Sequence, residues 1–210
     1  MRLLTPCQIV NILKNKADQK RPGGRTAEVT RRINGAVQQL LAEQGLDACT
    51  IKAIAERAGV QRSTLYRRSA DRWPIIMEAV IDLASRETAK FDSGSFCADM
   101  RIAMLNLARI LNGPLGPPLM EIAGALQSGV APGESERFWE SRRKLIAPMF
   151  DGAIARGELP ANIDRDAVFA MAAGPLYFQR FIRGAPIDPD WVERLVVQVC
   201  GLFVRPVSRA

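Results

Sequence analysis

The stretch that most constrains the fold of this chain is TIKAIAERAGVQRSTLYRRSADRW, residues 50–73. Its first part has the apolar spacing of a short helix. Thr50 is suited to cap the start of this helix, and Gly59 to the left-handed turn that closes its end. A second short helix, predicted at about residues 62–68, follows at once and has one main inward anchor, Leu65. Two short helices with a tight glycine turn, the second displaying cations and hydroxyls, are typical of a helix-turn-helix.

The basic residues of the chain are concentrated toward its N-terminal end. The whole chain has a formal net charge of +7. Through Ile75, 14 Lys and Arg residues stand against 6 Asp and Glu residues, so this part carries +8 and the remainder −1. A basic module joined to a nearly neutral remainder is expected of a nucleic-acid-binding protein, because Lys and Arg neutralise phosphates. An ordinary helical hairpin with a solvated charged face does not require this division, so the charge favours DNA recognition by the second helix.

Apolar residues recur at helical spacing along most of the remaining chain. A helix is expected from Thr26 to Gly45, and Asp71 is expected to cap a long helix that continues to about Lys90. Further helices are predicted at residues 98–112, 115–129, 135–156, 164–183 and 188–204. No strand alternation of useful length occurs. The sequence therefore predicts an all-α fold, in which an N-terminal three-helix bundle with the helix-turn-helix precedes a larger helical domain.

The sequence offers little chemistry for catalysis or metal binding. It has no histidine, and its cysteines, Cys7, Cys49, Cys97 and Cys200, are far apart with no CxxC pair. No metal site and no cofactor is predicted. Without a glycine-rich phosphate loop or a paired acidic motif, an enzyme is not expected either. The start lacks the apolar run of a signal peptide, and no run approaches the ~20 residues of a membrane span. We therefore expect a cytoplasmic protein without membrane association, whose four cysteines are reduced thiols.

Two separate regions of the chain carry recognisable motifs. The first, TIKAIAERAGVQRSTLYRR, combines a capped helix, an Ala-Gly-Val turn and a Thr-Leu-Tyr helix. The second lies near the C-terminal end, where GELP, AGPLYF and RGAPID punctuate the last helices. With both regions in this order, the chain resembles the TetR family of transcriptional regulators over about residues 25–203, and its C-terminal part resembles one subgroup of that family.

The resemblance implies roles for individual residues of the helix-turn-helix. Thr50 would meet a phosphate at the N-terminus of its helix. Arg62 would lead the recognition helix into the major groove, where its fork matches guanine O6 and N7. Lys52, Tyr66, Arg67 and Arg72 would mainly hold the phosphate backbone. The full set of expected DNA-contacting residues is Thr50, Lys52, Gln61, Arg62, Ser63, Thr64, Tyr66, Arg67 and Arg72.

Two positions depart from the family pattern. Gln61 stands where a short capping residue is common, so a weaker cap is expected for the recognition helix. Ser69 stands where the family usually has a Phe or Trp that supports this helix. We expect Trp73, four residues later, to supply that packing.

Composition and the resemblance together predict a division into segments. Residues 1–24 would form a basic flexible arm, because NKADQKRPGGR has cations, a proline and paired glycines without an apolar period. Such an arm would lie along a phosphate backbone or enter a minor groove, with a disordered tail or a misplaced start codon as the alternatives. Residues 25–72 would be the helix-turn-helix DNA-binding domain, and residues 73–205 the helical effector-binding and dimerisation domain.

Candidate residues for the ligand pocket and the dimer interface lie in this last segment. The pocket candidates are large or adaptable side chains on the central helices: Met100, Met104, Met120, Phe138, Trp139, Met149 and Met171. Ordinary core packing is the alternative for each of them. Arg109 and Arg142 have no obvious partner in the sequence and could meet an anionic ligand or lie in solvent. The interface candidates form apolar stripes on the last two helices: Val168, Ala172, Leu176, Trp191, Leu195, Val199 and Leu202. Packing within one subunit is the alternative here.

These expectations combine in one function. The chain is expected to be a DNA-binding transcriptional regulator, specifically a repressor that binds a palindromic operator in double-stranded DNA as a homodimer. A small, largely apolar effector of unknown identity would release it. The alternative is a helical protein-interaction module that does not bind DNA.

Overall fold

The computed structural model describes residues 24–87, 91 and 93–204, and every element within these residues is a helix. This confirms the predicted all-α fold. The predicted basic arm, apart from Gly24, lies outside the described residues. No helix in the described part of the chain is long and apolar enough to cross a membrane.

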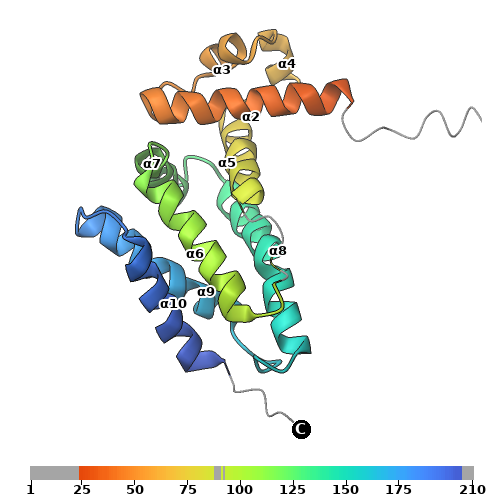
Figure 1. The fold of residues 1–210 in the computed structure, drawn as a ribbon. Coiled ribbons are helices and arrows are strands. Elements are labelled where there is room, and N and C mark those ends of the chain that lie inside the picture. Colours follow the sequence, from red (N-terminus) through yellow and green to blue (C-terminus); the bar gives the residue numbers. More distant parts are fainter. Residues whose placement is uncertain (1–23, 88–90, 92, 205–210) are drawn as a thin grey trace, which may run out of the picture.

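The N-terminal helices form a small head at one end of the molecule. Helix α2 (Arg25–Gln44) lies beneath α3 (Ile51–Ala58) and α4 (Arg62–Tyr66) in Figure 1. The face of α2 turned toward its neighbours is mostly apolar, and Val37 is completely buried there. Two polar side chains interrupt it: Asn34 is also buried, and Gln38 donates to the Ala79 carbonyl of α5. One anchor from each short helix, Ile54 and Leu65, is buried in the same core. The three helices thus enclose a core of their own and leave α4 at the surface.

Helix α5 (Trp73–Glu87) joins the head to the rest of the molecule. It packs against α2 near its start and against α8 (Glu134–Ala155) farther along (Figure 1). As expected from the sequence, Trp73 is buried in the core that also holds Leu65. The same core continues beyond the head, because Ile122 of α7 (Gly116–Gln127) belongs to it. The N-terminal head and the central part of the molecule therefore share one apolar cluster along α5.

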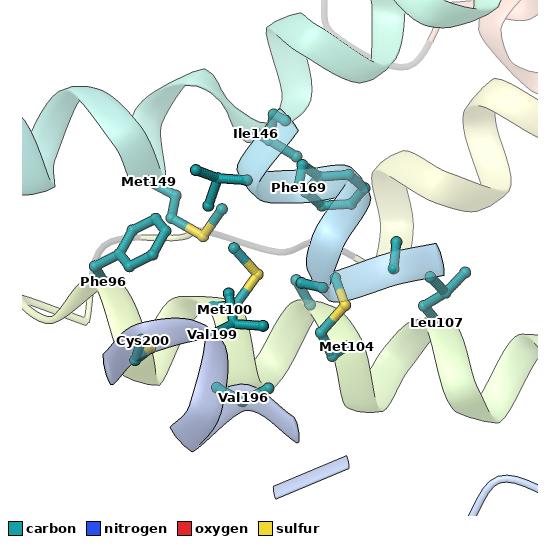
Figure 2. Packing of buried hydrophobic residues seen from close by; sticks show 14 of the residues in the cluster. Phe96, Met100, Met104, Leu107, Ile146, Met149, Phe169, Val196, Val199 and Cys200 are labelled. Atoms are coloured by element: carbon teal, nitrogen blue, oxygen red, sulfur yellow. The ribbon is translucent and has the colours of Figure 1, made fainter. Parts of the chain in front are cut away.

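A second core lies among α6 (Phe96–Asn112), α8, α9 (Arg165–Tyr177) and α10 (Pro189–Phe203). Helices α6 and α10 lie side by side (Figure 1). Figure 2 shows how Met100 and Met104 of α6 pack between side chains of α10, such as Val196, and those of α8 and α9. Several residues of this core, such as Ile146 and Phe169, also line the cavity described below.

Three local features differ from the predictions. The predicted helix at residues 164–183 changes to a π-helix over Phe178–Ile182 shortly after Pro175, whose missing N–H disturbs the regular pattern. Helix α5 begins at Trp73, two residues beyond the predicted Asp71 cap, and the Asp71 carboxylate accepts from the N–H of Arg72.

The third difference concerns the cysteines. The prediction of four reduced thiols is wrong, because the structure joins Cys97 on α6 to Cys200 on α10 in a disulfide. The two residues are 103 positions apart, and only the pairing of these helices in the fold brings them together. Cys49 is a buried free thiol, and Cys7 lies outside the described residues.

Candidate DNA-binding surface and ligand cavity

Helix α3 is fixed at both ends by the residues that the sequence singled out. The Thr50 hydroxyl accepts from the N–H of Ala53 at 3.1 Å, and the backbone at Gly59 has a φ of 62°, the left-handed conformation. The Gly59 carbonyl accepts from Arg32 on α2 at 2.7 Å. Because Arg32 occupies the space that a Cβ at position 59 would need, the turn favours glycine for room as well as for backbone conformation. The entry into α4 is therefore well defined.

Helix α4 is short and is held from behind. Gln61 makes no side-chain cap, as the sequence predicts, so the helix depends on tertiary contacts. Leu65 provides the buried contact, and Arg68 reaches back to Thr30 on α2, with 2.9 Å between Nη2 and Oγ1. A longer contact of 4.0 Å connects Arg68 to Glu78 on α5. These contacts orient α4 and leave its outer side free for DNA.

Most of the predicted DNA-contacting residues lie together on this surface. Thr50, Lys52, Gln61, Arg62, Ser63, Tyr66 and Arg67 are exposed, whereas Thr64 and Arg72 are half-buried. Tyr66 is 59% exposed, so its ring and hydroxyl are accessible on this surface. Arg72 donates to the Leu46 carbonyl at 3.4 Å, and its guanidinium lies over the Trp73 ring, 5.5 Å from the centroid. These contacts within the protein restrain the Arg72 side chain.

Sequence reasoning missed the arginines that brace the motif from within the protein. The sequence indicates Arg32 only as part of the positive charge and Arg68 as a side chain on the outside of its helix, whereas in the structure both hold the helices in place. Arg57 likewise binds Glu43 of α2 at 2.8 Å. No local signal separates a bracing arginine from a DNA-binding one, because the difference lies in which neighbour the fold supplies.

A cavity with two adjoining lobes lies between the two cores. The outer lobe, about 380 Å³, is formed by α8 and α9. The inner lobe, about 150 Å³, extends to α5, α6 and α7. The four residues that line both lobes are Phe138, Trp139, Arg142 and Tyr177. The outer lobe alone reaches the size of small-molecule sites, which begin at about 300 Å³. A wider hollow of about 510 Å³ beside Ile163 opens to solvent and is lined largely by charged side chains.

The predicted pocket residues divide into three groups. Phe138 and Trp139 line both lobes, and Met120 lines the inner one. Met100, Met104 and Met149 are packed in the second core, with exposures of 1% or less (Figure 2). Met171 is 45% exposed on α9. Ligand contact by any of these residues stays a prediction. Of the seven candidates, Met120, Phe138 and Trp139 are the ones that line the two lobes.

The predicted interface residues also differ in burial. Val168, Ala172, Leu176 and Val199 are buried within the single chain, and Trp191 and Leu195 are half-buried. Leu202 is 67% exposed. The exposed apolar side chains of the last helices are Met171, Phe178, Ile182, Val197 and Leu202, which we call the outer apolar face. The dimer interface stays a prediction.

The arrangement defines a class of protein, a helix-turn-helix regulator with a separate helical domain that holds a cavity. Residues 35–68 match the family of bacterial regulatory proteins called the tetR family, and residues 91–199 match the tetracyclin repressor-like C-terminal domain. The chain belongs to the TetR family.

Individual relatives agree with this assignment. The HTH-type transcriptional regulator YdeS of Bacillus subtilis is 31% identical over 180 residues, covering 85% of this chain and 91% of YdeS. The DNA-binding transcriptional repressor TetR of Mycobacteroides abscessus is 28% identical over 81% of this chain and 91% of its own length. Among solved structures, the TetR family transcription regulator SCO0332 has the same fold, with a TM-score of 0.70 at 24% identity over 83% of this chain and 97% of SCO0332. The chain is thus a DNA-binding transcriptional regulator of a non-enzymatic family, rather than an interaction module without DNA binding.

Proposed function

We propose that this regulator is a repressor that binds a palindromic operator as a homodimer and leaves it when a small, largely apolar effector enters the two-lobed cavity. The observation that carries the proposal is that the cavity touches α5. Met77, Val80, Leu83 and Ala84 of this helix line the inner lobe, and Trp73 at its other end lies in the core of the DNA-binding head. A ligand in the inner lobe would therefore press on the helix that carries the head.

On the DNA side, we propose that α4 enters the major groove. Arg62, Ser63 and Thr64 would reach base edges, with Gln61 beside them at the start of the helix. Thr50, Lys52, Tyr66, Arg67 and Arg72 would hold the phosphate backbone on either side. The exposure of seven of these nine side chains on one module supports the assignment.

For the dimer, we propose that the outer apolar face meets the same face of a second copy. Its members on α9, the π-helix and α10 are 45–73% exposed, although each is a large apolar side chain. Such a face is costly to leave in water and is suited to an interface between two copies related by two-fold symmetry. The predicted interface residues that are buried would support this face from beneath.

The remaining predictions fit the same scheme. Residues 25–72 would be the DNA-binding domain and residues 73–205 the effector-binding and dimerisation domain, with residues 1–24 as a basic arm. The motifs AGPLYF and RGAPID would assign the chain to one subgroup of the family. Because an operator lies on the chromosome, the protein would act in the cytoplasm. The repressor named among the relatives supports repression rather than activation.

The test is a mobility shift with the DNA that flanks the gene of this protein, with a scrambled duplex of equal length as the control. A reporter driven by the same DNA then decides the direction of regulation. Repression predicts that expression falls when the protein is supplied. A rise in expression would instead show that the protein is an activator. Equal binding to both duplexes in the mobility shift would show that the flanking DNA does not contain its operator.

A further inference from the structure

One cation in the two-lobed cavity differs from its neighbours on α8. Arg137, Arg143 and Lys144 are each paired with a carboxylate, at 3.3, 2.6 and 2.6 Å. Arg142 lies within 4.0 Å of no carboxylate in the described part of the chain. Its guanidinium lies over the Phe169 ring, 4.8 Å from the centroid. The Arg142 side chain therefore contacts the aromatic ring of another cavity residue, Phe169, and not a carboxylate.

The surroundings of Arg142 disfavour an isolated charge. Arg142 is half-buried, and Tyr177, which lines both lobes beside it, is 38% exposed. The partial burial lowers the pKa of Arg142 and raises the pKa of Tyr177. A cation removed from water is costly unless an anion or several acceptors replace the water. The Phe169 ring replaces only part of that solvation.

The remaining charges at the outer lobe compensate one another. Arg143 and Asp166 lie at its rim with 3.9 Å between Nη1 and Oδ2, and both side chains are largely exposed. The other lining residues of the two lobes, apart from Tyr177, are apolar or glycine. The unbalanced charge that the cavity presents to a ligand is thus the single positive charge of Arg142.

We propose that the effector is an apolar organic acid whose anionic group binds Arg142, while the Tyr177 hydroxyl donates a second hydrogen bond to the same group. The apolar body of the ligand lies against Phe138 and Trp139 and extends into the inner lobe toward α5. This inference rests on the proposed function, because it assigns the chemistry of the same effector cavity. It adds that the ligand has one acidic end.

The test uses two fluorescent probes with the same ring system. 8-Anilinonaphthalene-1-sulfonate is anionic, and N-phenyl-1-naphthylamine lacks the sulfonate. Full-length protein should bind the anionic probe more tightly. Arg142→Met should weaken the anionic probe by about 10- to 100-fold, the range for a lost hydrogen bond to a charged group, and should leave the neutral probe nearly unchanged. Arg142→Lys should restore part of the preference, and Lys144→Gln should retain it, because Lys144 is on the same helix but lines neither lobe.

A second variant locates the binding site. A Cβ at Gly174 on α9 would meet nothing within 4 Å, and Gly174 lines the outer lobe. Gly174→Leu should therefore fill the lobe without disturbing the fold, and both probes should lose affinity while the melting temperature holds. Equal affinity for both probes, unchanged by Arg142→Met, would overturn the proposal that the ligand is acidic. The proposal that an apolar ligand binds in the cavity would still hold. Probe binding that survives Gly174→Leu, or no binding of either probe, would remove the effector site of the proposed function as well.

Discussion

At the scale of the residue, Arg62 is held by a weak, exposed ion pair with Glu56. Its Nη2 lies 3.1 Å from Oε1 of Glu56 on α3, and the two side chains are 53% and 60% exposed. An ion pair this exposed contributes little to stability. If Arg62 contacts a base edge, as we propose, it can therefore leave Glu56 at small cost.

Arg62→Ala should weaken operator binding by about 1–3 kcal/mol and relax the preference at one base-pair position. The reason is the loss of a two-pronged contact to a base. Mobility shifts against a set of operators that differ at single positions, all at one salt concentration, measure both effects. An unchanged preference at every position would remove Arg62 from the base contacts.

Arg67→Ala is the matched comparison, because Arg67 is an exposed arginine at the opposite end of α4 from Arg62, and we assign it to the phosphate backbone. Its loss should weaken binding alike for all operators. It should also reduce the slope of log affinity against log salt by roughly one unit, since about one fewer counterion is released. A change in which operator is preferred would show that Arg67 reads bases.

Cys49 allows a prediction about reactivity and pH. Burial raises the pKa of its thiol to about 11, and the nearby Arg72 offsets this only in part. In a Cys7→Ser background, no thiol should react with 5,5′-dithiobis(2-nitrobenzoate) at pH 8 until the protein is unfolded. Because the folded state keeps the proton longer than the unfolded state, this thiol makes the free energy of unfolding fall as pH rises from about 9 to about 11. Rapid labelling of the folded protein at pH 8 would contradict the burial.

At the scale of the element, the helix-turn-helix could be predicted because its signals are local. Thr50 caps α3, Gly59 has the left-handed conformation and Leu65 is the buried anchor of α4, as their positions in the sequence indicate. The signals at Thr50 and Gly59 act within one helical turn, so they do not depend on distant contacts. The burial of Leu65 is a tertiary contact, but Leu65 is the main apolar side chain of its short segment and so could be identified.

The features that could not be predicted all depend on distant neighbours. A methionine at helical spacing fits a core and a cavity equally well, which is why Met100 and Met120 were grouped although they lie in different surroundings. An apolar stripe on α10 likewise does not indicate which side already packs on α6. Val199 is 4% exposed and Val197 is 70% exposed, although they are two residues apart. Only the packed structure separates them.

The link between α6 and α10 allows a test at this scale. The Cys97–Cys200 disulfide closes a loop of 103 residues, and such a bridge limits the freedom of the unfolded chain. Cys97→Ser should lower the free energy of unfolding by about 2–4 kcal/mol in denaturant titrations without reductant. Dithiothreitol should lower the wild-type value to that of the variant and leave the variant unchanged. Wild-type protein that unfolds alike with and without reductant would show that the bridge does not form.

At the scale of the whole molecule, the two cores and the cavity between them suggest how the sites communicate. The first core extends from α4 along α5 to Ile122 of α7, and the inner lobe borders this same helix pair. The second core, with its disulfide, holds α6, α8, α9 and α10 together. A ligand that fits the cavity better at one position of α5 would shift the population toward that position, by no more than its difference in affinity.

The proposed coupling requires two copies, since reading both halves of a palindromic operator would need recognition helices ~34–36 Å apart. Val197→Glu combined with Leu202→Glu places two carboxylates on the outer apolar face, where both side chains are exposed in the single chain. The variant should sediment as a monomer with native helical content and with much weaker operator binding. Ile102→Glu, a similar change at a 38% exposed position of α6, should remain dimeric. Val199→Glu would instead bury a charge inside the protomer and unfold it, because Val199 is buried in the single chain. Loss of the dimer in the double variant therefore supports the interface only if its melting temperature equals that of the wild type. An unaltered dimer in the double variant would place the interface elsewhere.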